Sequence, residues 1–152
     1  MDTIKDFEDM LDLLAKRGVR YLIIGGLAFI YHGKPRYTKD MDLWIEPSPE
    51  NIERANAALA EFGSPFVLDQ NDADKIVQVG LPPNRIGFLL QISGARFATA
   101  WKKRIVGFYG RAPANWIDID TLIRIKSRIN HRRHQEDVRV LREVKKRRAK
   151  PG

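Results

Sequence analysis

Apolar residues recur with helical spacing at the start of the chain and with strand spacing soon after it. The first set consists of Ile4, Phe7, Leu11 and Leu14. Its members are three or four residues apart, so they lie on one face of a helix, and acidic residues fill the opposite face. This pattern predicts an amphipathic helix that ends near Gly18.

The next segments predict a strand, a tight turn, a short helix and a second strand. Residues 19–24 (VRYLII) are almost all apolar, β-branched or aromatic, which is typical of a buried strand. Gly25-Gly26 ends this strand, and residues 27–32 then have the composition of a short helix. Over residues 39–46 polar and apolar side chains alternate, which is the period of a strand with two different faces.

The remainder of the chain predicts further helices and short strands. A helix is expected to begin at Ser48, its N-cap, and to end near Gly63. Strands are then expected over residues 76–81 and 85–92, joined by a turn at 82–84, followed by a short helix from Phe97 that ends in residues 102–104 and by strands over 105–109 and 114–117. A helix capped by Asp118 or Asp120 comes next, and a last helix carries Val138, Leu141 and Val144 and ends in the basic residues 145–150. This succession indicates an α/β or α+β fold, with a mixed β-sheet flanked by helices and closed by C-terminal helices.

Length and composition agree with one globular domain. The chain has 152 residues, of which 43% are hydrophobic, enough to bury a core. We expect a single domain over residues 1–144 and a basic, frayed tail over 145–152. No apolar run approaches the roughly 20 residues that span a bilayer, so no membrane association is expected. The absence of cysteine excludes disulfides and thiolate zinc sites, and with an N-terminus unlike a secretory signal it favours a cytoplasmic location.

Charge is distributed unevenly along the chain. The net charge is +8. Residues 1–76 contain 14 acidic and 9 basic side chains, whereas residues 77–152 contain 5 acidic and 18 basic ones. This asymmetry favours an anionic partner, and nucleic acid or a nucleotide fits better than a membrane. Residues 131–134 (HRRH) fit either a phosphate-rich groove or the end of a helix pair.

A pair of carboxylates stands on the polar face of the second predicted strand. Asp40 and Asp42 are two residues apart, so on a strand their side chains point to the same side, with Cα atoms about 6.5–7 Å apart. Such carboxylates repel each other and favour a shared cation, and their oxygens suit Mg²⁺ or Mn²⁺. The pair also fits two exposed aspartates at a strand edge that bind nothing.

The turn at Gly25-Gly26 has the features of a phosphate-binding site. It joins a buried strand directly to a helix, whose first turn presents free N–H groups and a partial positive charge. Glycines allow an anion to approach this backbone closely. A tight turn without a ligand is the alternative interpretation, but a strand with a carboxylate pair follows within 13 intervening residues. Together the two features predict a site for a metal-bound nucleotide.

The segment YLIIGGLAFIYHGKPRYTKDMDLWIEP resembles the defining segment of the polymerase-β-like nucleotidyltransferase superfamily. A hydrophobic strand, Gly-Gly, a spacer and Asp-h-Asp-h (h, hydrophobic) follow one another in both. Its G-G-x-A…H-G-x-P-R-x-T-x-D-x-D pattern is similar to a small prokaryotic group near the abortive-infection nucleotidyltransferases. The similarity is specific over residues 19–47 and continues more loosely in RIGFLLQISGARFATAWKKR and LIRIK…RRHQEDVRVL.

The resemblance implies a role for each matching position. Gly25 and Gly26 would contact the β- and γ-phosphates of a nucleoside triphosphate. Asp40 and Asp42 would hold the metal ions, Mg²⁺ or Mn²⁺, and would be the catalytic residues.

Three further positions match the group outside the Gly-Gly and Asp-x-Asp motifs. Arg36 and Thr38 match its R-x-T and would shape the site or touch phosphate. Lys126 matches a lysine on the helix that closes the pocket, where it would bind phosphate as a mobile point charge. A solvated helix position is the alternative for Lys126, and His32 is expected to be structural.

The chain departs from the group at one position. Enzymes of the superfamily use a third carboxylate on a later strand, which in this group commonly follows Arg-Ile. Here Arg85-Ile86 is followed by Gly87. Two carboxylates suffice to hold one metal ion, but catalysis is expected to suffer. Three acidic residues of the preceding loop are the candidates to substitute for the missing group: Asp69, Asp72 and Asp74.

The resemblance implies Mg²⁺-dependent transfer of a nucleoside monophosphate from a nucleoside triphosphate to an acceptor hydroxyl. RNA, a protein side chain and a small molecule remain open as acceptors, with the basic second half favouring RNA. Gly87 favours an alternative, a catalytically weakened fold that acts by binding, as a nucleotide sensor, an RNA-binding module or a toxin–antitoxin component. A third alternative is a basic nucleic-acid-binding domain with no nucleotide site.

Overall fold

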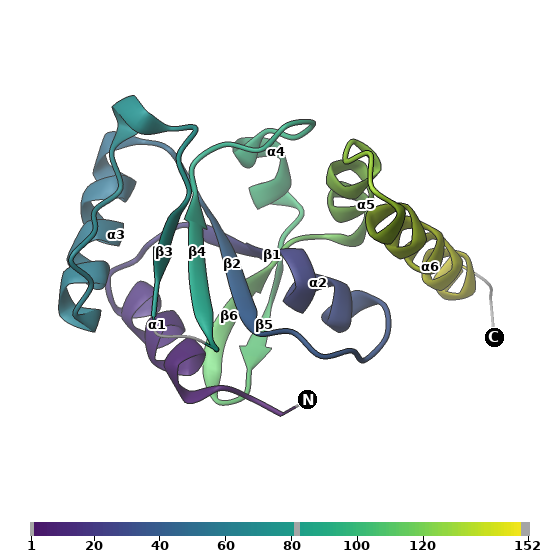
Figure 1. The fold of residues 1–152 in the computed structure, drawn as a ribbon, viewed down its shortest axis with the longest axis horizontal. Helices are drawn as coiled ribbons and strands as arrows, with labels where there is room; N and C mark the ends of the chain where they lie inside the picture. The colour runs from purple at the N-terminus through teal and green to yellow at the C-terminus, as the bar shows by residue number, and fades with distance from the viewer. Residues whose placement is uncertain (1, 81–82, 150–152) are drawn as a thin grey trace.

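Six strands form one mixed sheet in the order β3-β4-β2-β1-β6-β5 (Figure 1). The computed structural model describes residues 2–80 and 83–149. The strands are β1 (Tyr21–Ile24), β2 (Asp40–Ile45), β3 (Val77–Val79), β4 (Arg85–Leu89), β5 (Ile105–Tyr109) and β6 (Ala112–Trp116). The parallel pairs are β2 with β4 and β1 with β6, and the other neighbours are antiparallel. The expected mixed sheet flanked by helices is confirmed.

Helices cover both faces of this sheet (Figure 1). The helices are α1 (Lys5–Lys16), α2 (Gly25–His32), α3 (Pro49–Phe62), α4 (Phe97–Lys102), α5 (Ile119–Ser127) and α6 (Arg132–Ala149), with a 3-10 turn η1 (Gln70–Asp72) between α3 and β3. Each predicted helix and strand is present, and the C-terminal helix departs furthest from its expected ends. Part of the turn expected at 82–84 lies outside the described residues.

The C-terminal helix differs most from expectation. It begins at Arg132 and runs without a break to Ala149, although the sequence predicts fraying from residue 145. Lys145 forms an ion pair with Asp120 of α5, and Arg148 donates to the carbonyl oxygen of His32 at 3.4 Å. These contacts with α5 and α2 hold the last turns against the domain. Residues 150–152 of the predicted tail lie outside the described residues.

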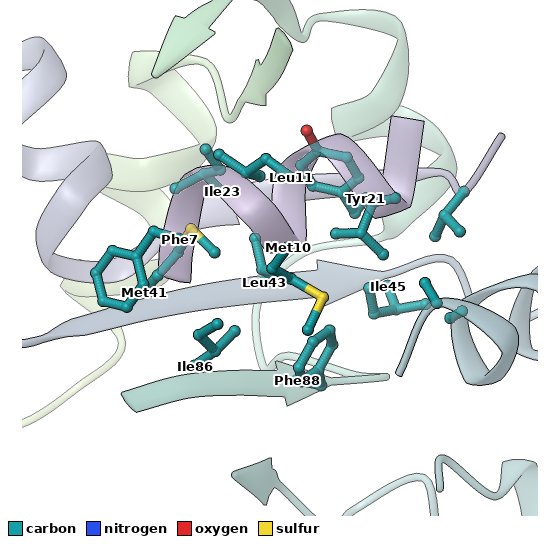
Figure 2. Packing of buried hydrophobic residues seen from close by; sticks show 14 of the residues in the cluster. Phe7, Met10, Leu11, Tyr21, Ile23, Met41, Leu43, Ile45, Ile86 and Phe88 are labelled. Carbon is teal, nitrogen blue, oxygen red and sulfur yellow. The ribbon is translucent and has the colours of Figure 1, made fainter. Parts of the chain in front are cut away.

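One face of the sheet packs against the amphipathic helix α1 and the helix α3. Figure 2 shows the apolar side chains of α1 directed toward those of the central strands. The labelled members of this cluster are Phe7, Met10, Leu11, Tyr21, Ile23, Met41, Leu43, Ile45, Ile86 and Phe88. Met41, Leu43 and Ile45 are the alternate residues of β2 and are fully buried. Their burial turns Asp40 and Asp42 toward the opposite face.

The opposite face is covered by α2, α4, α5 and α6. Its buried cluster joins β1 and β2 to these helices, with Leu22, Trp44, Phe29, Leu122 and Leu141 among its members. The candidate site lies on this face, at the end of the sheet where β1 ends and β2 begins.

Side-chain caps fix where two of the helices begin. The Ser48 hydroxyl accepts a hydrogen bond from the Asn51 N–H at 3.3 Å at the start of α3, as the sequence predicts. At α5, Asp118 rather than Asp120 is the cap, and its carboxylate accepts from the Thr121 N–H at 3.0 Å. Within the described ranges, no helix has the length and apolar character needed to cross a membrane.

Candidate active site

The predicted phosphate-binding turn and the carboxylate pair meet at one end of the sheet. In the antiparallel pairing of β1 with β2, Ile24 lies opposite Asp42. Gly25 and Gly26 follow Ile24 immediately and form the first residues of α2. The helix therefore begins inside the Gly-Gly turn, two residues earlier than expected, and its free backbone N–H groups lie beside the carboxylates.

Gly25 is required by both its backbone conformation and its surroundings. Its φ of +67° lies in the left-handed region, which favours glycine. A Cβ atom at this position would collide with Oδ2 of Asp42. At the next position, a Cβ on Gly26 would come within 3.0 Å of Oγ1 of Thr38. The two glycines therefore make room for the side chains of Asp42 and Thr38.

Asp40 and Asp42 differ in their environments. The side chain of Asp40 is exposed, whereas that of Asp42 is half-buried. Burial is the largest cause that raises the pKa of Asp42, to about 6, and repulsion by Asp40 adds to it while the charge of Lys126 opposes it. Over residues 2–80 and 83–149 neither carboxylate forms an ion pair. The pair therefore carries negative charge without an ion-pair partner in these ranges, at the N-terminal end of α2.

This donor set fits a hard divalent cation. Two carboxylates that form no ion pair within residues 2–80 and 83–149 provide the oxygen ligands that Mg²⁺ and Mn²⁺ prefer. A bound cation would offset the repulsion between the two carboxylates, which adds to the effect of burial on the pKa of Asp42. No group of three or more His, Cys, Asp or Glu side chains in the described residues is arranged to hold a metal. Asp69, Asp72 and Asp74 therefore do not complete the set.

Thr38 orders the chain just before β2. Its hydroxyl donates to the carbonyl oxygen of Asp40 at 3.3 Å and accepts from the N–H of Asp40 at 3.4 Å. The hydroxyl also borders Gly26. Thr38 thus lies between the Gly-Gly turn and the carboxylates, in agreement with a role in shaping the site.

Arg36 and Lys126 both form hydrogen bonds with the carboxylate of Asp137, a residue that the sequence analysis does not single out. Two nitrogens of the Arg36 guanidinium donate to the two oxygens of Asp137 at 2.7 and 3.0 Å. Lys126 donates to Oδ2 of Asp137 at 2.9 Å. Lys126 is 3% exposed, so it is not a solvated position. The arginine also stacks over the ring of Phe29 at 4.1 Å.

The ionisation of this cluster reflects burial and mutual attraction. Burial alone would raise the pKa of Asp137, but the hydrogen bonds from Arg36 and Lys126 outweigh it and lower that pKa. Burial lowers the pKa of Lys126, and the bond to Asp137 opposes this change. The sequence contains one indication that Asp137 is buried. It directly precedes Val138 and stands four residues before Leu141, so it lies on the buried side of α6.

Gly87 lies beside Asp42 in the parallel pairing of β2 with β4. It is buried, and a Cβ added to it would lie 3.0 Å from Oδ1 of Asp42. A carboxylate at this position would therefore face the Asp40/Asp42 pair. The absence of a side chain at position 87 leaves the pair as the only acidic groups contributed by these two strands.

His32 is structural, as expected. Its ring is 3% exposed, and Nε2 donates to the carbonyl oxygen of Ile117 at 2.7 Å. Burial lowers the pKa of His32, which the bond to Ile117 opposes. The neutral ring thus links the end of α2 to the chain entering α5.

The three-dimensional arrangement is that of known nucleotidyltransferases. No protein-family model and no curated protein matches the sequence. The lincosamide antibiotic adenylyltransferase LnuA, bound to lincomycin, is similar with a TM-score of 0.64 and 15% sequence identity, over 93% of this chain and 98% of that chain. ANT(2″)-Ia in complex with adenylyl-2″-tobramycin is similar with a TM-score of 0.61 and 17% sequence identity, over 94% of this chain and 92% of that chain.

A third solved structure is also similar to this chain. It is an antigenic nucleotidyltransferase-like protein from Paracoccidioides brasiliensis, with a TM-score of 0.55 and 15% identity, over 97% of this chain and 77% of that chain. At these identities the likeness concerns the fold, and it agrees with the order of strands and helices described above. The chain has the nucleotidyltransferase fold.

Proposed function

We propose that this protein transfers a nucleoside monophosphate from a nucleoside triphosphate to an acceptor hydroxyl, with Mg²⁺ or Mn²⁺ as the metal. The observation that carries the proposal is the pairing of Ile24 with Asp42, which sets the Gly25-Gly26 turn against the carboxylates. The phosphates of the nucleotide lie at this turn, where backbone N–H groups and the helix dipole favour anions. The fold supports the proposal, since one of the similar structures is an adenylyltransferase and another holds an adenylylated antibiotic.

The residues act on the reaction by binding and orientation. The acceptor oxygen forms a bond to the α-phosphorus, the bond from the α-phosphorus to the β-phosphate oxygen breaks, pyrophosphate leaves, and the hydroxyl proton passes to solvent. Asp40 and Asp42 would hold the metal ion, which would neutralise charge that develops on the phosphate oxygens. The turn at Gly25-Gly26 orients the leaving phosphates.

Lys126 is the side chain that we propose to contact the phosphates as well. Its ammonium has three N–H donors, and within the described part of the chain one of them forms a hydrogen bond, to Asp137. The remaining donors and the effect of its charge on Asp42 support contact with phosphate. Arg36 donates hydrogen bonds to both oxygens of Asp137 and so contributes to phosphate binding indirectly, by orienting the partner of Lys126.

A basic groove supports an anionic acceptor such as RNA. It has a volume of about 710 Å³, and its cationic lining includes Lys34, Arg36, Arg132 and Arg133. Lys34, Arg132 and Arg133 form no ion pair with the described residues, so their charges are available to a phosphate backbone. A protein side chain or a small molecule is the alternative acceptor.

The second candidate function is binding without turnover, and Gly87 is the observation that favours it. A site with two carboxylates can hold one metal-bound nucleotide, but it lacks the third acid expected to activate the attacking hydroxyl. In this case the protein acts as a nucleotide sensor, an RNA-binding module or a toxin–antitoxin component.

Radiolabel transfer separates the two candidates. The protein is incubated with each α-³²P-labelled nucleoside triphosphate and Mg²⁺ in the presence of total RNA, protein extract or a small-molecule pool. Transfer that is lost in Asp40→Ala and Asp42→Ala but kept in the exposed control Glu53→Ala supports the enzyme. Nucleotide binding without transfer supports the second candidate, and the lack of both sinks the proposal.

A further inference from the structure

The edge strand β5 presents an uncovered apolar face. It is the last strand in the sheet order, and no other described strand pairs with its outer edge. Val106 and Phe108 are alternate residues of β5, so they lie on one face, and they are 71% and 67% exposed. Large exposed apolar side chains along a strand edge are typical of a surface that pairs with another chain.

The backbone of β5 is oriented for such pairing. Residues 105–109 pair with residues 112–116 of β6 in an unbroken antiparallel register, in which Phe108 lies opposite Pro113. Pro113 has no N–H, so Phe108 and Pro113 do not form a hydrogen-bonded pair. The two kinds of pair alternate along an antiparallel ladder. The N–H and C=O groups of Val106 and Phe108 therefore point away from β6, toward the outer edge.

β5 lacks the features that usually protect an edge strand from association. Its sequence, IVGFY, contains no charged residue and no proline, and its register with β6 has no bulge. The strand at the opposite edge, β3 (Val77–Val79), has only three residues. Very short edge strands pair weakly with other chains, so β5 is the edge at which association is expected.

A basic segment lies at one end of β5 and a carboxylate at the other. Residues 102–104 (KKR) lead into the strand. At the turn that follows it, the N–H of Arg111 donates to Oε1 of Glu8 at 3.1 Å, and a Cβ added to Gly110 would collide with the same oxygen. Within residues 2–80 and 83–149, neither Glu8 nor residues 102–104 form an ion pair. The edge therefore has complementary charges at its two ends.

We propose that β5 pairs with β5 of a second copy of this chain, antiparallel and about a twofold axis at Gly107. This register sets Val106 of each copy opposite Phe108 of the other, so the outward-facing backbone groups form hydrogen-bonded pairs and the apolar side chains pack across the strands. It also sets Arg104 of each copy opposite the turn that holds Glu8 in the other. The two six-stranded sheets become one continuous sheet.

The charges select this register among its neighbours. An axis at Val106 would set Arg104 against Phe108, and an axis at Phe108 would set Val106 against the turn. Only the axis at Gly107 pairs apolar residues with each other and the basic segment with the carboxylate. In the sheet, β6 separates β5 from β1, so the inference does not depend on the proposed function.

Sedimentation velocity from micromolar to millimolar concentration tests the association. We expect the unsubstituted protein to form a reversible dimer. Val106→Lys is expected to raise the dimer Kd by at least about tenfold, because it removes both of its cross-strand pairs and brings charge into the interface. Val67→Lys is the matched control, since Val67 is 66% exposed and lies outside β5, and its Kd is expected to stay unchanged. Circular dichroism melts establish that each variant is folded.

Single cysteines test the register, because the chain has no cysteine of its own. The proposed axis brings the two copies of position 107 to a Cα separation of about 4.5 Å, so Gly107→Cys is expected to form an interchain disulfide when oxidised. A Cβ at Gly107 has its nearest neighbour at 3.7 Å, an ordinary contact, so the fold accommodates it. Val106→Cys is expected to cross-link only when mixed with Phe108→Cys.

Three results overturn the inference. The first is a monomer at every concentration, which holds even if β5 pairs with a different protein. The second is a dimer whose Kd is the same in folded Val106→Lys. The third is a dimer in which Gly107→Cys does not cross-link, and this result decides the matter if Val106→Lys fails to fold. Each leaves the label-transfer assay untouched, so failure of the proposed function is recognised separately.

Discussion

Asp42 and Gly87 are direct neighbours across the parallel strands β2 and β4, and a Cβ added to Gly87 would lie 3.0 Å from Oδ1 of Asp42. The position that would best supply another carboxylate to the site is thus the one without a side chain. A half-buried acid, Asp42, faces this gap. The number of carboxylates at the site therefore depends on which residue occupies position 87.

Gly87→Asp is expected to raise both metal affinity and transfer activity. A third carboxylate adds an oxygen ligand and a group that activates the acceptor hydroxyl, so we expect at least about a tenfold gain in label transfer. Without metal the same variant is expected to unfold at a lower temperature, because three carboxylates then repel one another. The control is Gly87→Ala, which adds the Cβ contact alone. Equal activity in both variants would contradict the prediction.

Asp42→Asn is expected to stabilise the metal-free protein at neutral pH. The pKa of Asp42 is raised from 3.8 to about 6, so its contribution to stability is full below pH 3.8 and is lost as the pH rises through 6. A shift of this size corresponds to about 2–3 kcal/mol of unfolding free energy at pH 8. Thermal melts in chelator at pH 4 and pH 8 measure it, with the exposed Glu53→Gln as control. A gain of the same size at both pH values would rule out this explanation.

Gly25→Ala is expected to cost more stability than Gly18→Ala. Both glycines have φ near +65°, but a Cβ on Gly18 meets nothing within 4 Å, whereas one on Gly25 collides with Asp42. The backbone effect alone amounts to about 1–2 kcal/mol, which we expect for Gly18→Ala, with a further loss for Gly25→Ala. Urea unfolding measures both. Asp42→Asn/Gly25→Ala should not recover the loss, since the amide fills the same space.

His32 is expected to weaken the fold in mild acid. Burial lowers its pKa below the ordinary value of 6.5, so the unfolded chain takes up the proton first as the pH falls. The unfolding free energy contributed by His32 is therefore present above pH 6.5 and is lost as the pH falls below it. The slope of stability between pH 7 and pH 5 should become flatter in His32→Gln. The exposed His131→Gln serves as control and should keep the original slope.

The sequence predicts the fold and the meeting of the two motifs because both depend on short-range patterns. Alternation along β2 determines that Asp40 and Asp42 share a face, and the turn at Gly25-Gly26 follows the neighbouring strand directly. Periodicity likewise reveals the helices and the cap at Ser48.

Such short-range patterns do not predict that Asp137 is the partner of Arg36 and Lys126. Asp137 is 101 residues from Arg36, and only the packing of α6 against the loop before β2 brings them together. Local sequence likewise does not distinguish Asp118 from Asp120 as the cap of α5, because both can start the helix. The contacts of Arg36 and Lys126 with phosphate stay predictions.

The pairing of Arg36 with Asp137 also sets the order in which the site is completed during synthesis. The Gly-Gly turn and Asp42 emerge from the ribosome early, but the anchor for Lys126 and Arg36 is made only after residue 137 has been translated. The contact between Arg36 and Asp137 closes a loop of 101 residues, so it costs chain entropy and requires both segments to be present. A nascent chain that ends before α6 therefore leaves Arg36 and Lys126 without Asp137, and the charge balance of this cluster is established only once α6 has been made.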